Sequence, residues 1–136
     1  MKMVKVTTES DISVVDVSKN PGEYIYSRIA HEIGCSVIEI VRPQGLEHPF
    51  MMIVDEEGLL VDRPVINPIG SYLYRYQEHR NPIAGHLVIG KEIMTDEGPD
   101  IGGLNDQEAH SLVLHLQKTA PHAIAVIKAT MKGRQT

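Results

Sequence analysis

Short apolar runs separated by turn-forming residues recur along residues 1–93, and several contain the β-branched residues that favour strands. In residues 35–41, Val37, Glu39 and Val41 alternate with Ser36, Ile38 and Ile40, which is the pattern of a strand buried on at least one face. Residues 50–54 precede Asp55-Glu56-Glu57-Gly58, which has the composition of a hairpin turn. The pattern predicts strands at residues 3–8, 13–17, 35–41, 50–54, 59–61 and 83–93, with one hairpin joining the first two and another joining 50–54 to 59–61.

Two Asn-Pro pairs carry the start signal of a helix. Asn20 precedes Pro21 and Asn67 precedes Pro68, so each asparagine can cap a helix whose first residue is the proline. Gly34 supplies the left-handed position that ends the first of these helices. The signals predict a helix at residues 21–33 and a short one from residue 68 to about residue 76.

A third helix is predicted to begin after Leu104. Asn105 provides the N-cap, and Glu108 occupies the third helical position of a capping box. An apolar stripe follows, and Pro121 is expected to end the helix. Residues 122–131 fit either a second short helix or an edge strand, and the spacing of their apolar residues favours the helix.

The order of these elements predicts an α+β fold with a small, mostly antiparallel sheet and two main helices packed on it. Residues 94–103 are acidic and contain glycine, and we expect a surface loop there. The chain of 136 residues fits one domain, which we assign to residues 1–121. Residues 122–136 are then a C-terminal extension whose apolar side chains need a surface to cover, so we expect a homo-oligomer with this extension in its interface.

Composition and charge exclude several classes of partner. The net charge of −5 argues against a general nucleic-acid surface, because non-specific affinity for nucleic acid comes mostly from Lys and Arg. The N-terminal residues lack the apolar segment of a secretory signal, and no apolar run approaches the roughly 18 residues of a membrane span. One cysteine cannot form an internal disulfide. We expect a cytoplasmic protein that binds neither nucleic acid nor membranes.

The histidines and the cysteine do not form a recognisable chemical site. There are seven histidines, but His110 and His115 lie five residues apart on a predicted helix and do not share a face. Cys35 follows a helix C-terminus, where the helix dipole disfavours a thiolate, so it is expected to be a small core residue. We therefore expect no catalytic residue, no metal site and no cofactor.

Arginine, tyrosine and asparagine residues gather in the proline-bounded stretch from Arg63 to Gly90. Guanidinium groups recognise phosphate or carboxylate in a bidentate way, and tyrosine offers a stacking surface. The stretch is either an anion or nucleotide pocket or a set of capping, core-edge and solvated residues, and both interpretations stay open. As a ligand site it comprises Arg63, Asn67, Tyr74, Arg75, Arg80, Asn81 and His86.

Three segments in this order resemble the family known as domain of unknown function 3846: NPIGSYLY at 67–74, NPIAGHLVIG at 81–90 and DIGGLNDQEAHSLVLHL at 100–116. The resemblance covers about residues 20–118. It implies a setting in phages and mobile elements of bacteria, often near genes that counter host defence. It implies no particular activity.

Together these observations predict a non-enzymatic binding protein of a phage or mobile element, which counteracts host defence by holding a nucleotide-type ligand or a host protein in the host cytoplasm. One alternative is a small enzyme that acts on a nucleotide or phosphoester, with His86 as general base and Arg75 or Arg80 stabilising the anion. The other is a structural or regulatory module that acts through oligomerisation.

Overall fold

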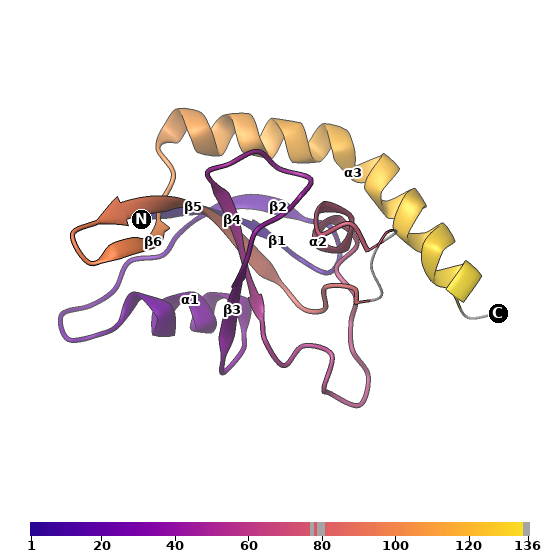
Figure 1. Cartoon of the computed structure of the whole chain (residues 1–136), viewed down its shortest axis with the longest axis horizontal. Coiled ribbons are helices and arrows are strands. Elements are labelled where there is room, and N and C mark those ends of the chain that lie inside the picture. Colours follow the sequence, from indigo (N-terminus) through magenta and orange to yellow (C-terminus); the bar gives the residue numbers. More distant parts are fainter. Residues whose placement is uncertain (77, 79–80, 135–136) are drawn as a thin grey trace.

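An antiparallel sheet lies between helices on both of its faces (Figure 1). The structure is a computed structural model and describes residues 1–76, 78 and 81–134. These residues form the elements β1 Lys2–Val6, β2 Ile12–Asp16, α1 Ile25–Ile33, β3 Ile38–Val41, β4 Phe50–Asp55, α2 Pro68–Leu73, β5 Leu87–Thr95, β6 Gly98–Gly102 and α3 Asp106–Arg134. The predicted α+β class is confirmed.

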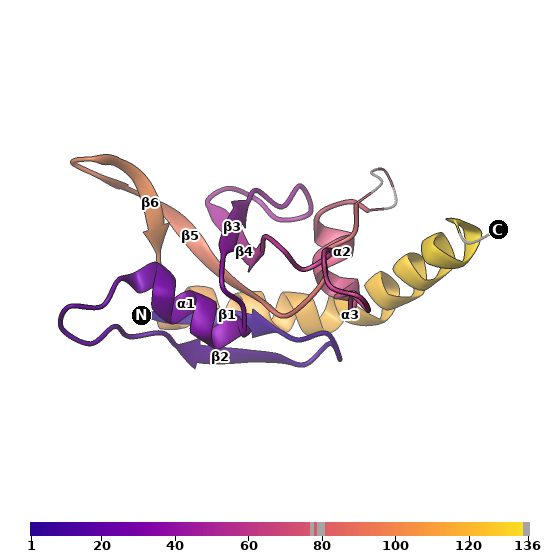
Figure 2. The same cartoon turned by 90° about the horizontal axis from the view of Figure 1, so that it is seen from below.

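The sheet is built around β5. The strand order is β2-β1-β5-β4-β3, and β6 pairs with the far half of β5. All of these pairs are antiparallel. Figure 2 shows the β5–β6 hairpin extending beyond the body of the sheet. Gly90 permits the close pairing there, because a Cβ on it would lie 2.6 Å from the carbonyl oxygen of Gly102.

The alternation of side chains along the strands divides the core between the two faces of the sheet. One cluster lies toward α1, and the other lies toward α2 and α3. The first contains Met3, Val17, Ile29, Ile33, Met51, Ile53, Val88 and Ile101. The second contains Val4, Val6, Val41, Met52, Val54, Ile69, Leu73, Ile83, Leu87, Ile89, Leu104, Ala109, Leu112 and Leu116. Since both faces of the inner strands are buried, their sequences read as continuous apolar runs.

The buried side chain of Asn67 connects α2 to the sheet. Its Oδ1 accepts a hydrogen bond from the backbone N–H of Gly70, which is the predicted N-cap contact. Its Nδ2 donates to the carbonyl oxygens of Val6 and Gly85, each at 3.0 Å. One fully buried amide therefore fixes the start of α2 against the end of β1 and the segment before β5.

The first Asn-Pro pair behaves differently from the second. Asn20 Nδ2 donates to Glu23 Oε1 at 2.7 Å, and Gly22 has a positive φ of 85°. These contacts form a turn, so α1 begins at Ile25 and the predicted start at residue 21 is wrong. The predicted end is confirmed, because Gly34 has the left-handed φ of 76°.

Two predictions about strands were wrong. β4 pairs with β3 rather than with residues 59–61, which form turns and bends outside the sheet. Leu60 is 78% exposed, so the apolar run there gains no burial from pairing. Residues 94–103 are not a loop throughout, since β6 pairs with the end of β5 from Lys91↔Gly102 to Thr95↔Gly98.

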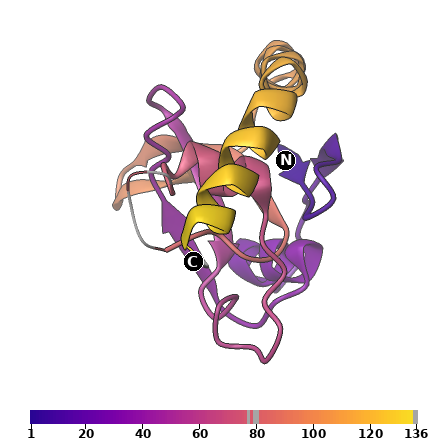
Figure 3. The same cartoon turned by 90° about the vertical axis from the view of Figure 1, so that its right-hand side faces the viewer.

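α3 does not end at Pro121 but continues to Arg134. The helix bends in its second half, which runs at an angle to the first half (Figure 3). Ala123 and Ile127 are buried there, and the rings of Tyr72 in α2 and His122 meet edge to face at 5.5 Å. Burial against α2 therefore covers part of the apolar surface that the sequence assigned to an interface, and homo-oligomerisation stays a prediction.

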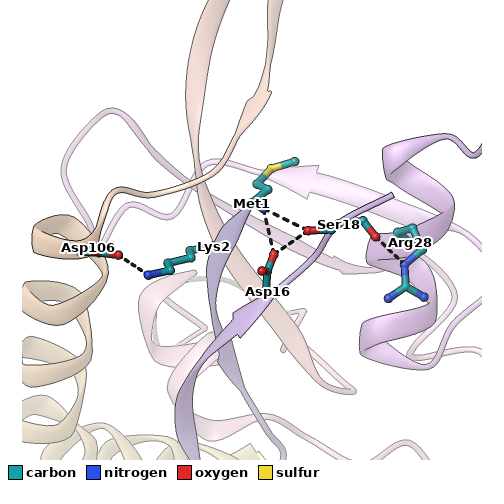
Figure 4. A network of polar contacts seen from close by, with 6 residues as sticks. All are labelled: Met1, Lys2, Asp16, Ser18, Arg28 and Asp106. Carbon is teal, nitrogen blue, oxygen red and sulfur yellow. Dashed lines mark hydrogen bonds and ion pairs between the residues drawn. The ribbon is translucent and has the colours of Figure 1, made fainter. Parts of the chain in front are cut away.

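Polar contacts hold the N-terminal residues to β2 and α3, and a further contact holds α1 to the segment after β2 (Figure 4). The Met1 amino group donates to Asp16 Oδ1 at 2.9 Å, and Lys2 forms an ion pair with Asp106 at the start of α3. The Arg28 side chain of α1 donates to the backbone oxygen of Ser18 at 3.1 Å.

Within the described residues, no helix is long and apolar enough to cross a membrane.

We predict that Asn67→Ala destabilises the protein by about 3 kcal/mol or more, because it removes the cap of α2 and two buried hydrogen bonds to the carbonyl oxygens of Val6 and Gly85. Urea denaturation measures the change. The matched control is Asn20→Ala, which removes one exposed hydrogen bond at the other Asn-Pro pair and should cost less than about 0.5 kcal/mol. Equal effects of the two substitutions would contradict the structural role of Asn67.

We also predict that Ile127→Ala costs about 3 kcal/mol, since the side chain is 1% exposed. Ile124→Ala, on the same helix but with the side chain 37% exposed, should cost about 1 kcal/mol or less. Thermal denaturation of both variants at low protein concentration provides the comparison. If Ile127→Ala leaves the stability unchanged, the second half of α3 does not belong to the folded core.

Candidate functional site

The structure gives two of the predicted ligand residues internal roles. Asn67 uses its side-chain amide in the three hydrogen bonds described above, so it has no free group to offer a ligand. His86 Nδ1 accepts a hydrogen bond from the backbone N–H of Thr8 at 3.2 Å. Both side chains connect segments that are distant in the sequence. Their placement favours the capping interpretation over the ligand interpretation for these two residues.

The two described arginines of the predicted cluster, Arg63 and Arg75, do not line a common cavity among those found in the described residues. Arg63 is exposed in the segment between β4 and α2. Arg75 has a left-handed φ of 62°, and its guanidinium forms an ion pair with Glu78 at 3.2 Å. Arg80 lies outside the described residues. Anion binding by the arginines stays a prediction.

Tyr74 and Asn81 do come together, in a pocket of about 190 Å³ beside β3 and β4. Three carboxylates stand around it, and its described lining contains no Lys or Arg. Such a pocket attracts cationic groups and repels phosphate. Its lining is Glu39, Val41, Val54, Asp55, Glu56, Leu59, Tyr74, Asn81, Pro82, Ile83 and Ala84. We call it the acidic pocket.

A larger and mainly apolar groove lies on the opposite side of β3, between this strand and α1. It has a volume of about 480 Å³, and its walls come from α1 and from the chain at and before β3. We call it the α1–β3 groove; it is lined by Tyr26, Ser27, Ala30, Ser36, Val37, Ile38 and Ile40. Tyr26, Val37 and Ile40 are each about 40% exposed, at 40%, 43% and 38%.

The packing of α1 and the strand order of the sheet explain why this groove stays open. α1 packs Ile29 and Ile33 in the core cluster that lies toward it, whereas Ala30 lines the groove. β3 is the last strand on its side of the sheet. Because no further strand of the described chain continues the sheet beyond β3, the space between its side chains and α1 is left open to solvent.

The outer edge of β3 carries backbone groups without a partner among the described residues. The Glu56 N–H donates to the Val37 oxygen, and these residues are opposite one another in the β3–β4 register. In an antiparallel pair, hydrogen-bonded positions alternate, so Glu39 and Val41 also bond to β4. The N–H and C=O groups of Ile38 and Ile40 therefore point away from the sheet. The groove thus runs beside an unpaired strand edge.

Ionisable groups in and beside the groove have shifted pKa values. The Tyr26 hydroxyl donates to Asp100 of β6, which lowers the pKa of the Asp100 carboxyl and raises the pKa of the tyrosine. Next to the lining residue Ser36, burial raises the pKa of the Cys35 thiol, and the nearby charges of Asp55 and Glu57 raise it further. The start of β3 therefore lies in a negative potential.

Sequence reasoning missed the α1–β3 groove. A usable signal was present, because residues 35–41 carry apolar side chains on both faces of a strand that has one partner in the sheet. Tyr24 and Tyr26 also place aromatic rings on the solvent side of α1, at 79% and 40% exposure. An edge strand beside exposed aromatic residues indicates a binding surface more directly than arginine content does.

A second apolar groove on the other face offers a comparison. It has a volume of about 420 Å³, close to that of the α1–β3 groove, and an exposed serine of α3 lies in its wall. Its lining residues are Gly45, Leu46, Glu47, Phe50, Ser111, Leu112 and His115. Phe50 belongs to β4, an inner strand of the sheet, so this groove has no unpaired strand of the sheet at its side.

Comparisons with known proteins identify a family without an assigned activity. The family model described as Domain of unknown function (DUF3846) matches residues 1–117. This range includes the α1–β3 groove and stops within α3. No curated protein and no solved structure matches the chain.

We predict that Tyr26→Phe raises the pKa of the Asp100 carboxyl, because the tyrosine hydroxyl is the main group that lowers it. The Ile101 N–H still donates to Asp100, so the pKa should stay below the ordinary range of an aspartate. A carboxyl with a lowered pKa stabilises the fold above its unfolded-state pKa, and this contribution is lost as the pH falls through the lowered value. NMR titration of the side-chain carboxyl carbons measures the shift.

The control is Tyr24→Phe, which changes a tyrosine two residues away that is 79% exposed. It should leave the Asp100 titration where it is in the wild type. A Tyr26→Phe variant whose Asp100 also titrates like the wild type would show that the hydroxyl does not hold this carboxyl in solution.

Proposed function

The chain belongs to the DUF3846 family, and we propose that it is a non-enzymatic binding protein whose α1–β3 groove takes a segment of another polypeptide. The observation that carries this proposal is the position of the groove beside the unpaired edge of β3. An apolar trough next to free backbone N–H and C=O groups offers both kinds of contact that extended peptides use.

The lining of the groove supports a polypeptide over a nucleotide. Apolar side chains and the hydroxyl groups of Tyr26, Ser27 and Ser36 form its described walls, and no guanidinium or ammonium group is among them. The neighbouring acidic pocket repels phosphate. Of the two ligand classes that the sequence suggested, a protein partner therefore agrees better with the described surface.

The setting that we propose is the one that the resemblance implies: a phage or mobile element whose product acts in the cytoplasm of its host. Family membership and the overall negative charge are compatible with that setting, and the partner would then be a host protein, including one of a defence system. Nucleotide binding is an alternative outcome that the experiment below can detect.

We predict that peptides selected from a random displayed library on the immobilised wild-type protein bind through the α1–β3 groove. Ser27→Arg fills the groove with a long charged side chain at an exposed position in the first turn of α1, where a cation opposes the helix dipole by at most about 1 kcal/mol. It should weaken the selected peptides about ten-fold or more while the protein stays folded. Fluorescence anisotropy with labelled peptides gives the dissociation constants.

The matched control is Ser111→Arg, the same substitution at the exposed helical serine of the α3 groove. It should leave peptide affinity within about two-fold of the wild type. Peptides that lose affinity with Ser111→Arg but not with Ser27→Arg would move the site to the α3 groove. A library that yields no binder, together with heat of binding to a nucleotide panel, would favour the nucleotide alternative.

A further inference from the structure

We infer that the partner binds by adding a strand to the outer edge of β3, and that it is an extended segment in which apolar residues alternate with basic ones. This inference rests on the proposed function and specifies its binding mode and the chemistry of the ligand. Three features of β3 carry it: the direction of its backbone groups, the faces that its side chains occupy, and the charge on each face.

The backbone of β3 provides the hydrogen-bonding groups to which an added strand can pair. Ile38 and Ile40 each present one N–H and one C=O outward, as the alternation of the β3–β4 hydrogen bonds requires. An antiparallel segment can pair with both residues and form up to four hydrogen bonds. This continues the pairing of the whole sheet, in which every strand pair is antiparallel.

The side chains of β3 determine the pattern of the added segment. Ile38 and Ile40 line the α1–β3 groove, whereas Glu39 lines the acidic pocket on the opposite face. Residues directly opposite one another in a sheet project to the same face. The two segment residues that pair with Ile38 and Ile40 therefore project into the apolar groove, and the residue between them projects toward Glu39.

Charge complementarity identifies the middle residue as basic. Glu39 shares the acidic pocket with Asp55 and Glu56, and this pocket has no Lys or Arg in its described lining. A lysine or arginine in the added segment would meet these carboxylates, while an acidic residue would be repelled.

The same charge disfavours a second copy of this chain as the occupant. Two β3 strands that pair antiparallel over their full length, with Ile38 opposite Ile40, would place Glu39 directly opposite its own counterpart. Like charges at directly opposite positions are destabilising. Registers that separate the two glutamates shorten the overlap of a strand that has only four residues.

The test uses a blocked, fluorescently labelled peptide in which three valines alternate with two lysines. It should bind the wild-type protein, and Ser27→Arg should weaken it about ten-fold or more. N-methylation of the valines removes the N–H groups that face β3, and it should also weaken binding about ten-fold or more. N-methylation of the lysines alters N–H groups that face away from β3, and it should leave the affinity within about two-fold.

Two substitutions in the protein test whether the outward N–H groups of β3 take part in binding. Ile40→Pro removes an outward N–H that the β3–β4 pair does not use, and it should abolish binding while the protein stays folded. Its control is Val14→Pro on the opposite edge strand β2. By the same alternation, the backbone bonds Thr7–Asp11 and Val17–Met1 leave the Val14 N–H pointing outward, and this variant should bind normally.

A substitution of Glu39 tests the preference for a basic residue in the added segment. Glu39→Lys should weaken the lysine peptide about two- to five-fold and strengthen a peptide with glutamates in place of the lysines by a similar factor. Equal binding of both peptides to the wild type would overturn the basic pattern.

Failure of the binding mode differs from failure of the proposed function. Binding that is lost with Ser27→Arg but insensitive to both N-methylation patterns would keep the groove as the site and overturn strand addition. Absence of any peptide binding that depends on Ser27 would overturn both.

Discussion

The side-chain amide of Asn67 is the contact on which the arrangement of the layers depends most directly. It is fully buried, and all three of its hydrogen bonds go to backbone groups of different segments. Because unpaired backbone groups are costly to bury, α2 can settle on the sheet only where Val6, Gly85 and Gly70 present their polar atoms together. In that position α2 lies beneath α3. Ile69 of α2 then packs in the core, and Tyr72 of α2 contacts the long helix α3.

Local sequence signals predicted the start of α2 and the end of α1, although the Asn-Pro signal at Asn20 failed because a turn forms there. Asn67 caps a helix and Gly34 ends one, because each role needs only neighbouring residues. The sequence misled where tertiary contacts decide. Residues 59–61 have no strand partner, whereas residues 98–102 pair with β5. Pro121 is tolerated inside α3 because its position is exposed and can lose one backbone hydrogen bond, while the neighbouring turns pack on α2.

The candidate site was less accessible to sequence reasoning than the fold. Arginine and tyrosine content indicated residues 63–90, but proximity in the sequence does not bring side chains to one face. Asn67 and His86 bond to the protein's own backbone, and Tyr74 and Asn81 share a pocket with carboxylates. The α1–β3 groove depends on strand order, because β3 stays an edge only if the later strands pair elsewhere, and β5 joins the sheet next to β4 instead of next to β3. No single-residue pattern records that order.

The late position of β5 in the chain has a consequence for biosynthesis. The described β1–β2 and β3–β4 pairs are joined through β5, whose residue Ile89 lies between Val4 and Met52. A nascent chain that has not yet released residues 87–91 from the ribosome therefore holds two separate hairpins, and β1 and β4 expose their inner, mostly apolar edges. β1 and β5 are far apart in the sequence, and closing the long loop between them before their contacts form slows folding. The exposure of the β1 and β4 edges therefore lasts longer. Newly made copies should depend on chaperones more than the size of the finished domain would suggest.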